Sequence, residues 1–448
     1  MKIAILIIIT ITLLWNLFLR ICNLRSTKNE IPENVKDIYD EETYRKWKNY
    51  YKEKITISVI HSLFDFVVGI CLIIFNVYTL FDLEGFFVPA LLVTLFDIVV
   101  NTVISIPMNY RNTFKIEEKY GFNKCSKKTF VSDEIKNFVI KFVLMVGLVS
   151  IYMLSHQKLG DKMIFLFVGV IIVFDLLIGF LSPVLVKIFN KLTSLEEGEL
   201  RDKLSDLLTK NGYSVRDIKV MDESKRSTRA NAMFSGFGKS KTIILYDNLV
   251  NNFTPDEICA VFAHEMGHGM HKDTLKMQFI SFILICVLGI GAWLLVRYDS
   301  IYFDFGFTKV NYGFALIMMG ALMGFLTPLF GLISNALSRY AEYRADKQAV
   351  IEGYGDELIS ALKKLTKLNF RNLAPFKINV LLEYSHPTTS QRIDAIKKAQ
   401  KRISKWRNKF RFNWTFLFGR KQIILLFGKC YCQQRMSDFL ALSKRNRA

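Results

Sequence analysis

The chain contains little cysteine for its length, with seven among 448 residues. The number is odd and the positions are scattered. No CxxC pair with metal-ligand spacing occurs, and Cys430-x-Cys432 alone is a weak pattern. The sequence therefore argues against a disulfide framework, and reduced thiols on a cytosolic side are the simpler interpretation.

Acidic residues are scarce relative to basic ones: 40 Asp and Glu stand against 60 Lys and Arg, for a formal net charge of +20. Such an excess could serve a nucleic-acid partner, but the bases gather in alternate segments, at 23–55, 109–135 and 190–276. This is the positive-inside pattern of a multi-pass membrane protein. We therefore expect no nucleic-acid partner, an N-terminus in the lumen, and the segment 190–276 in the cytosol.

Charge is nearly missing from seven apolar stretches, although the chain as a whole is 22% charged and has a mean hydropathy of +0.24. Each stretch has about the 20 residues that a helix needs to cross a membrane. The first has no small-residue cleavage pattern before Arg20, so we expect a retained signal anchor. The seven stretches are 3–22, 56–81, 86–108, 136–154, 163–189, 277–296 and 312–337.

A few polar side chains interrupt these stretches. Intramembrane carboxylates cost free energy and usually face a wet interior. Several of them on different helices therefore indicate a polar cavity. These residues are His61, Asp65, Asp97 and Asp175.

Histidine is rare, with six in the chain, yet three lie between 264 and 271 and a fourth is His386. The pentad His264-Glu265-Met266-Gly267-His268 places two histidines on one helix face, where both can bind a single Zn²⁺. Glu265 is then the expected general base for an attacking water, and Gly267 leaves room near the metal. The pattern predicts a metalloprotease with one zinc ion per chain.

A catalytic zinc ion needs a third protein ligand, and Glu342 is the best candidate. It lies in a charged helical run that continues the last apolar stretch. Asp346 shares its helix face and could accept a hydrogen bond from a ligating histidine. Taken alone, Glu342 could equally be a solvated salt-bridge partner; the HExxH pentad favours the ligand.

Two further histidines lie near the predicted site in the sequence. His386 precedes a proline, which predicts an extended backbone, and its N–H could stabilise an oxyanion. His271 follows His268 by three residues and is interpreted as a polar residue at a helix end.

Before the pentad, the pattern changes to β-type runs at Ser214–Met221 and 242–246, which predict a short antiparallel sheet with a glycine turn at 236–238. Such a sheet offers an edge that can hold a substrate backbone. Thr254 is the expected N-cap of the pentad helix. The alternating charges and leucines of 189–210 predict an extension of the fifth apolar helix.

The tail from about residue 404 carries many bases against one acid, Asp438, with two apolar islands too short to span a membrane. It could lie on an anionic membrane face, or it is a poorly ordered extension.

Separated motifs resemble, in the same order, those of the integral-membrane zinc CAAX prenyl proteases, which are seven-span gluzincins of the endoplasmic reticulum. The resemblance covers about residues 35 to 400. Where the family commonly has a second proline and an acid after His-Pro, this chain has Thr388 and Gln391. The matching stretches are Thr113–Asn123, Leu195–Arg201, Ser224–Ser227, Asn231–Phe237, Ala263–His268, Ser338–Asp346 and Ser385–Pro387.

The resemblance implies a mainly α fold: a seven-span helical membrane barrel enclosing a chamber, with a cytosolic gluzincin-type protease segment that carries a small β-sheet. It implies removal of the C-terminal aaX tripeptide from isoprenylated CAAX proteins, and in some members a second, upstream cut. Membrane lipid and isoprenylated CAAX proteins or peptides are the implied partners. The implied location is the endoplasmic reticulum membrane, with the catalytic site facing the cytosol.

The resemblance also implies roles for individual residues. His264, His268 and Glu342 would bind zinc, Glu265 would be the base and His386 would stabilise the oxyanion. An edge strand carrying Asn231 and Ala232 would pair with substrate, and Asp346, Arg339 and Arg392 would support the site.

The expected organisation has five parts: spans 1–5 with their loops in 1–189, a catalytic segment in 190–276, spans 6–7 in 277–339, a second catalytic segment in 340–403, and the basic tail 404–448. One alternative function is a membrane quality-control zinc protease that degrades misfolded or translocon-stalled proteins. Another is a catalytically idle protein or a transporter. Glu265 argues against the idle protein, since a purely structural zinc ion needs no base.

Overall fold

The fold is that of a computed structural model, which describes residues 1–212, 214–235 and 240–406. Six continuous helical segments among these residues are long and apolar enough to cross a membrane, and one of them, Lys127–Gly179, includes the short turn between two helices. The seven long helices are α1 (Lys2–Arg25), α2 (Glu41–Ile74), α3 (Phe87–Arg111), α4 (Lys127–Leu159), α5 (Met163–Phe189), α9 (Asp273–Arg297) and α11 (Tyr312–Glu352).

These helices correspond to the seven predicted apolar stretches, with one correction at an end. The second stretch was predicted to run to residue 81, but α2 ends at Ile74 and a short 3-10 turn follows at Val77–Phe81. Asn76 between them has a left-handed backbone with φ +54°. That conformation ends a helix, and Asn tolerates it better than most residues do.

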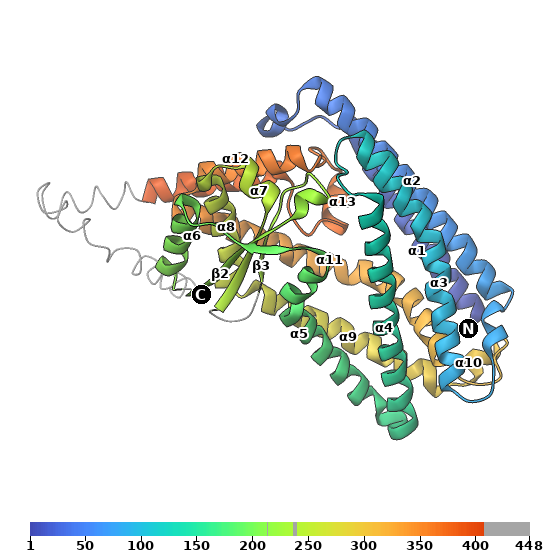
Figure 1. The fold of residues 1–448 in the computed structure, drawn as a ribbon. Helices are drawn as coiled ribbons and strands as arrows, with labels where there is room; N and C mark the ends of the chain where they lie inside the picture. Colours follow the sequence, from blue (N-terminus) through green and yellow to red (C-terminus); the bar gives the residue numbers. More distant parts are fainter. Residues whose placement is uncertain (213, 236–239, 407–448) are drawn as a thin grey trace, which may run out of the picture.

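The long helices close into a ring. Each contacts the next in the order α1, α2, α3, α4, α5, α9, α11, and α11 contacts α1 again. Figure 1 shows these helices arranged around the molecule, with α1 to α3 on one side and α5 and α9 on the other. Many of their large apolar side chains are exposed, as expected for a surface covered by lipid.

Buried clusters lie at both ends of the ring. At one end, Tyr152 and Tyr302 belong to an apolar cluster formed by α3, α4, α11 and the loop 298–311. At the other end, α6, α8 and α12 form a second cluster with strands of a small sheet. Further helices complete the fold: α6 (Glu199–Lys210), α7 (Asp247–Asn252), α8 (Pro255–Met270), α10 (Ser300–Phe303), α12 (Gly355–Leu368), α13 (Lys377–Leu382) and a helix over 389–406.

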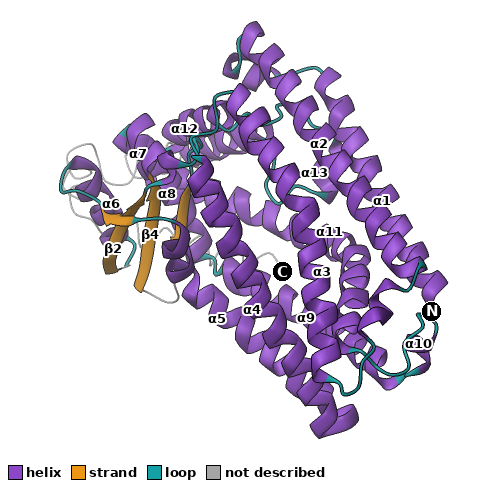
Figure 2. Ribbon diagram, turned by 45° about the vertical axis from the view of Figure 1, so that its right-hand side comes forward, coloured by secondary structure: helices purple, strands orange, loops and turns teal. Residues whose placement is uncertain are grey.

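The sheet has four strands in the order β1-β2-β4-β3, shown beside α6 and α8 in Figure 2. They are β1 (Leu192–Ser194), β2 (Ser214–Met221), β3 (Ala232–Ser235) and β4 (Ser240–Tyr246). The predicted antiparallel pairing of the two main strands is wrong, because β2 and β4 are parallel. Between them in the chain, β3 pairs antiparallel with β4 and occupies the edge of the sheet. The predicted glycine turn at 236–238 lies outside the described residues.

The predicted extension of α5 through residue 210 is also wrong. The helix ends at Phe189, Leu192–Ser194 pairs with β2 as strand β1, and α6 then begins at Glu199. Gly198 before α6 has a φ of +150°, which a helix cannot contain. The tail from residue 407 onward, with Cys430 and Cys432, lies outside the described residues.

Candidate metal centre

Helix α8 carries the pentad and is fixed at its start by a capping box. The Thr254 hydroxyl accepts a hydrogen bond from the Glu257 amide at 3.3 Å, which confirms Thr254 as the predicted N-cap, and the Glu257 carboxylate accepts one from the Thr254 amide at 2.9 Å. Glu257 also accepts hydrogen bonds from Ser360 at 2.6 Å and Lys364 at 2.7 Å. These two residues lie on α12, so the capping box also joins α8 to its neighbour.

Close packing of α8 against α11 brings two parts of the site together. A Cβ atom added at Gly267 would lie 2.8 Å from the Ala345 Cα and 3.1 Å from the Gln348 Cβ. Gly267 was predicted to leave room near the metal. In the structure its missing side chain instead allows the α11 backbone to approach.

Replacing Gly267 by alanine should therefore push α8 and α11 apart. We expect a loss of about 1–3 kcal/mol of stability, the usual cost of overpacking, together with weaker divalent-metal affinity. Thermal unfolding and a competition assay with a chelator measure the two effects. Gly147→Ala is the matched control, since nothing lies within 4 Å of its added Cβ in α4. Equal thermal stability and equal metal affinity of the two variants would contradict the close packing of α8 against α11.

Three predicted ligands converge at this contact. His268 Nε2 lies 3.2 Å from Glu342 Oε1, and His264 Nε2 lies 3.5 Å from Glu342 Oε2. One potential ligand atom from each residue lies within 4.8 Å of the others. His264 and Glu342 are buried, and His268 is half-buried.

The outer nitrogen of each histidine meets a carboxylate. His264 Nδ1 lies 2.9 Å from Asp346 Oδ1, and His268 Nδ1 lies 3.2 Å from Asp273 Oδ2. Such contacts keep the proton on Nδ1 and leave Nε2 free to bind a metal. Asp346 was predicted, whereas Asp273 was missed. It begins α9, and only its position five residues after His268 could have pointed to it.

Arg392, from the helix over 389–406, compensates the buried carboxylates. It donates to Asp346 at 2.6 and 3.0 Å, and its Nη1 lies 3.2 Å from Glu342 Oε2. Burial alone lowers the pKa of this guanidinium, but the charges of Asp346 and Glu342 raise it overall. The arginine is therefore a fixed positive charge behind the site.

Thr388 and Gln391, the two departures from the family pattern, begin that helix. The Thr388 hydroxyl accepts a hydrogen bond from the Gln391 backbone amide at 3.2 Å, and the Gln391 side-chain oxygen accepts one from the Thr388 backbone amide at 3.0 Å. This reciprocal pair is a capping box. It holds the first turn of the helix that carries Arg392.

His386 reaches the site from the preceding loop. Its Nε2 lies 3.4 Å from Glu342 Oε1, and its Nδ1 lies 2.8 Å from the Ser385 hydroxyl. Burial lowers the pKa of the His386 imidazole. Arg339 holds this loop, because its Nη1 donates to the carbonyls of Val380 at 2.9 Å and Tyr384 at 2.7 Å.

Glu265 is half-buried and directly follows His264. Burial lowers the pKa of His268, but the hydrogen bond and charge of Glu342, followed by Glu265 and Asp273, raise it overall. Glu265 thus belongs to the same electrostatic cluster as the candidate ligands.

Asn231 and Ala232 lie beside α8 at the sheet edge. Ala232 begins the edge strand β3 and lies opposite Leu245 of β4. The Asn231 carbonyl accepts a hydrogen bond from the Tyr246 backbone amide at 3.1 Å. Helix α8 contacts β3. The edge strand therefore lies next to the helix that carries the histidines.

The four polar residues that interrupt the predicted apolar stretches each lie beside another polar group. Asp97 accepts hydrogen bonds from Tyr78 and Asn101, each at 2.9 Å. Asp175 contacts Gln278, and His61 Nε2 lies 3.5 Å from Asp65.

The donor set fits a zinc ion. Two imidazoles and one carboxylate are the ligands of one type of catalytic zinc site. Glu342 Oε2 is buried and makes no hydrogen bond within the described part of the chain, despite the nearby Arg392. A buried carboxylate oxygen without a hydrogen bond is costly and is the kind of atom that a metal ion satisfies.

Comparison with known proteins places this site in context. Residues 20–191 match the family described as "CAAX prenyl protease N-terminal, five membrane helices", and residues 194–400 match "Peptidase family M48". A relative from Schizosaccharomyces pombe, named probable CAAX prenyl protease 1, is 31% identical over 409 residues and covers 85% of each chain. CAAX prenyl protease 1 of Saccharomyces cerevisiae is 28% identical over 410 residues, or 83% of this chain and 89% of its own.

The fold also has a solved counterpart. The crystal structure of S. mikatae Ste24p superimposes with a TM-score of 0.82 at 25% identity, covering 88% of this chain and 98% of that one. This match confirms the expected fold class: a mainly α membrane barrel with a chamber, and a gluzincin-type segment with a small sheet.

Proposed function

We propose that this chain, which belongs to the CAAX prenyl protease family of M48 peptidases, removes the C-terminal aaX tripeptide from isoprenylated CAAX proteins. One observation carries the proposal: His264, His268 and Glu342 converge, with Glu265 beside them, at one end of a ring of apolar helices. A prenyl chain partitions into a membrane, so a prenylated C-terminus and this site would meet at the bilayer surface.

His264, His268 and Glu342 would hold one zinc ion. A bound zinc ion would supply Lewis-acid chemistry, polarising the scissile carbonyl and making water a stronger acid. Asp346 and Asp273 would keep the two imidazoles in the binding tautomer, and Arg392 would neutralise the carboxylates behind them.

Proton transfer falls to Glu265. Its carboxylate would take a proton from the attacking water and return it to the leaving amine, so that the carboxylate is regenerated. His386 would donate its Nε2–H to the oxygen that becomes negative in the tetrahedral intermediate. Arg339 would keep the loop of His386 in place.

The edge strand would hold the substrate. Asn231 and Ala232 precede or begin β3, whose outer edge has no neighbouring strand within the described sheet. An extended peptide could pair with this edge through main-chain hydrogen bonds while its scissile bond lies over α8.

The protein is a multi-pass membrane protein, and we place it in the endoplasmic reticulum membrane with the metal centre facing the cytosol. The distribution of Lys and Arg supports this orientation, because the basic segments 23–55, 109–135 and 190–276 all lie at the end of the ring that carries the site. The alternative, a quality-control protease, would use the same site. The relatives described above are named for CAAX processing, which favours the first function.

The deciding experiment offers purified protein in detergent a farnesylated CAAX peptide, an unprenylated copy and an unfolded protein. We expect release of the last three residues from the farnesylated peptide only, with inhibition by a zinc chelator. Cleavage of the unfolded protein without cleavage of the farnesylated peptide would replace the proposal with quality control.

Replacing His386 by glutamine should lower kcat by about 10²–10³-fold, as expected when one oxyanion donor is lost. Zinc content should stay unchanged, because His386 is not among the proposed ligands. Steady-state kinetics and metal analysis of the same preparation give both values. A loss of zinc together with activity would assign His386 to metal binding instead.

A further inference from the structure

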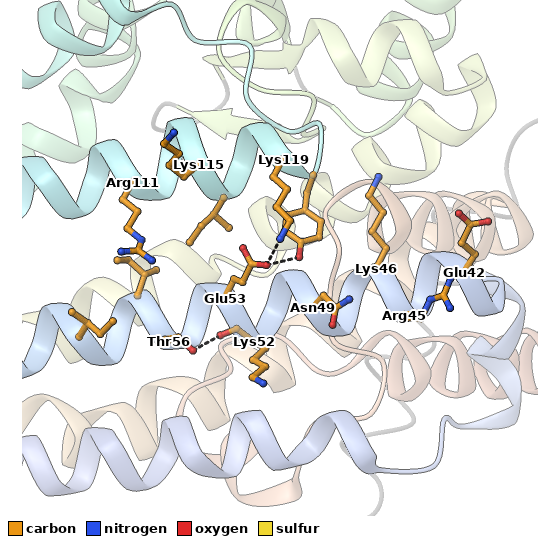
Figure 3. A pocket seen from close by; sticks show the side chains of 14 residues that line it. Glu42, Arg45, Lys46, Asn49, Lys52, Glu53, Thr56, Arg111, Lys115 and Lys119 are labelled. Atoms are coloured by element: carbon orange, nitrogen blue, oxygen red, sulfur yellow. Dashed lines mark hydrogen bonds and ion pairs between the residues drawn. The ribbon is translucent and has the colours of Figure 1, made fainter.

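A hollow of about 810 Å³ lies outside the metal centre, between the N-terminal half of α2 and the end of α3 with its π-helical turn η4 (Asn112–Glu117). Figure 3 shows Arg111, at the end of α3, and Lys119, just after η4, extending toward α2. The lining residues are Glu42, Arg45, Lys46, Asn49, Lys52, Glu53, Thr56, Ile57, Ile60, Arg111, Lys115, Ile116, Lys119 and Tyr120.

The lining is strongly basic. Its charged members are six bases and two acids, Glu42 and Glu53, which leaves four positive charges in excess. Glu53 is already engaged by Lys119 at 2.6 Å and by the Tyr120 hydroxyl at 2.9 Å. The other five bases make no ion pair with any described residue; they are Arg45, Lys46, Lys52, Arg111 and Lys115.

A nearby acid does not cancel this charge. Glu117 accepts a hydrogen bond from Lys54 at 2.7 Å and forms an ion pair with Arg229 at 3.3 Å. It is therefore neutralised by residues that do not line the hollow.

The hollow spans the boundary between the polar and apolar parts of its walls. On α2 the bases end at Lys54 and the apolar stretch begins at about residue 56, so Ile57 and Ile60 lie at the membrane end. On α3 the apolar stretch ends near residue 108, just before Arg111. The base of the hollow is apolar, since Ile57, Ile116 and Tyr120 are buried in one cluster.

The hollow is on the same side of the membrane as the metal centre. Trp47 of α2 donates to the Phe370 carbonyl at 3.0 Å and packs in a cluster with Leu373 and Ile393. These residues flank the loop that carries His386. The bases therefore face the lipid headgroups of the leaflet on the catalytic side.

The positive-inside rule explains why bases occur here, but it does not require them to line one hollow. We propose that this hollow binds the headgroup of an anionic phospholipid that carries phosphomonoester groups, of the phosphoinositide class. The excess of four positive charges is more than the single net charge of phosphatidylserine can neutralise. Arg45 and Arg111 can each bind phosphate oxygens in bidentate fashion, and the acyl chains would continue along Ile57 and Ile60 into the bilayer.

The test measures binding of short-chain phosphatidylinositol 4-phosphate to the full chain in detergent by native mass spectrometry. Lys46→Gln with Arg111→Gln removes two exposed bases from the hollow. The matched control, Lys397→Gln with Lys401→Gln, removes the same charge from an exposed basic face of the helix over 389–406. Unchanged thermal unfolding verifies that each variant is folded.

The hollow variant should bind at least about ten-fold more weakly, because it lacks two of the bases that attract the anionic headgroup, whereas the control should match the native protein. Equal losses in both variants would overturn the proposal in favour of general charge attraction, and no loss in either would also overturn it. Free inositol phosphate should bind far more weakly than the lipid. Equal binding of the two would overturn the lipid assignment and leave a soluble phosphate compound as the ligand.

Discussion

Replacing Glu265 by glutamine should abolish peptide hydrolysis while leaving zinc bound. The variant keeps the proposed ligands His264, His268 and Glu342, but its amide cannot accept the proton of the attacking water. Removal of a general base costs about 10²–10⁴-fold in kcat. Tripeptide release from a farnesylated peptide and zinc content, measured on one preparation, give the two values.

The control for this variant is Asp256→Asn, which removes a carboxylate from the first turn of the same helix. Asp256 is about half exposed and pairs with Lys203 at 2.8 Å, away from the ligands. It should keep full activity. Near-native hydrolysis by the Glu265→Gln variant would refute the proton-transfer scheme.

Replacing His264 by alanine should remove both zinc and activity. The change deletes one of the three proposed ligands and leaves the buried Asp346 carboxylate with Arg392 alone. A catalytic zinc site needs three protein ligands, and only His268 and Glu342 would remain. Metal analysis should show zinc falling toward zero, with hydrolysis at background.

His271→Ala is the matched control for the ligand variant. His271 lies three residues beyond His268 as the C-cap of α8 and is not in the ligand group. It should retain zinc and activity. Glu342→Gln provides a second ligand variant if His264→Ala does not fold. Retention of zinc by both ligand variants would exclude this site.

The sequence was informative where chemistry depends on local spacing. The i, i+4 spacing of His264 and His268 and the capping box at Thr254 are properties of one helix, and the structure shows both. Glu342 was found because a catalytic zinc ion needs a third ligand, and Glu342 lies in the charged helical run that continues the last apolar stretch. The apolar helices were found because their length and lack of charge are set by the membrane.

Features that depend on contacts between distant segments were missed. In the sequence, Asp273 cannot be told from any other acid at the start of a helix. Its role is visible only in the structure, where it lies 3.2 Å from His268 Nδ1. Strand β3 pairs with the edge of β4 that faces away from β2, so β2 and β4 are parallel neighbours. The residue pattern of each strand does not show which strand it pairs with. Gly267 was predicted to leave room near the metal, but the neighbour that it accommodates is α11.

The most direct test of the central claim is a zinc titration of the metal-free protein, measured as cleavage of the farnesylated peptide. We expect activity to rise in proportion to added zinc and to reach a plateau at one ion per chain. We also expect the Glu265→Gln variant to take up the same ion without gaining activity. Full cleavage by zinc-free protein, or a plateau at a different stoichiometry, would contradict a single hydrolytic centre built from His264, His268 and Glu342.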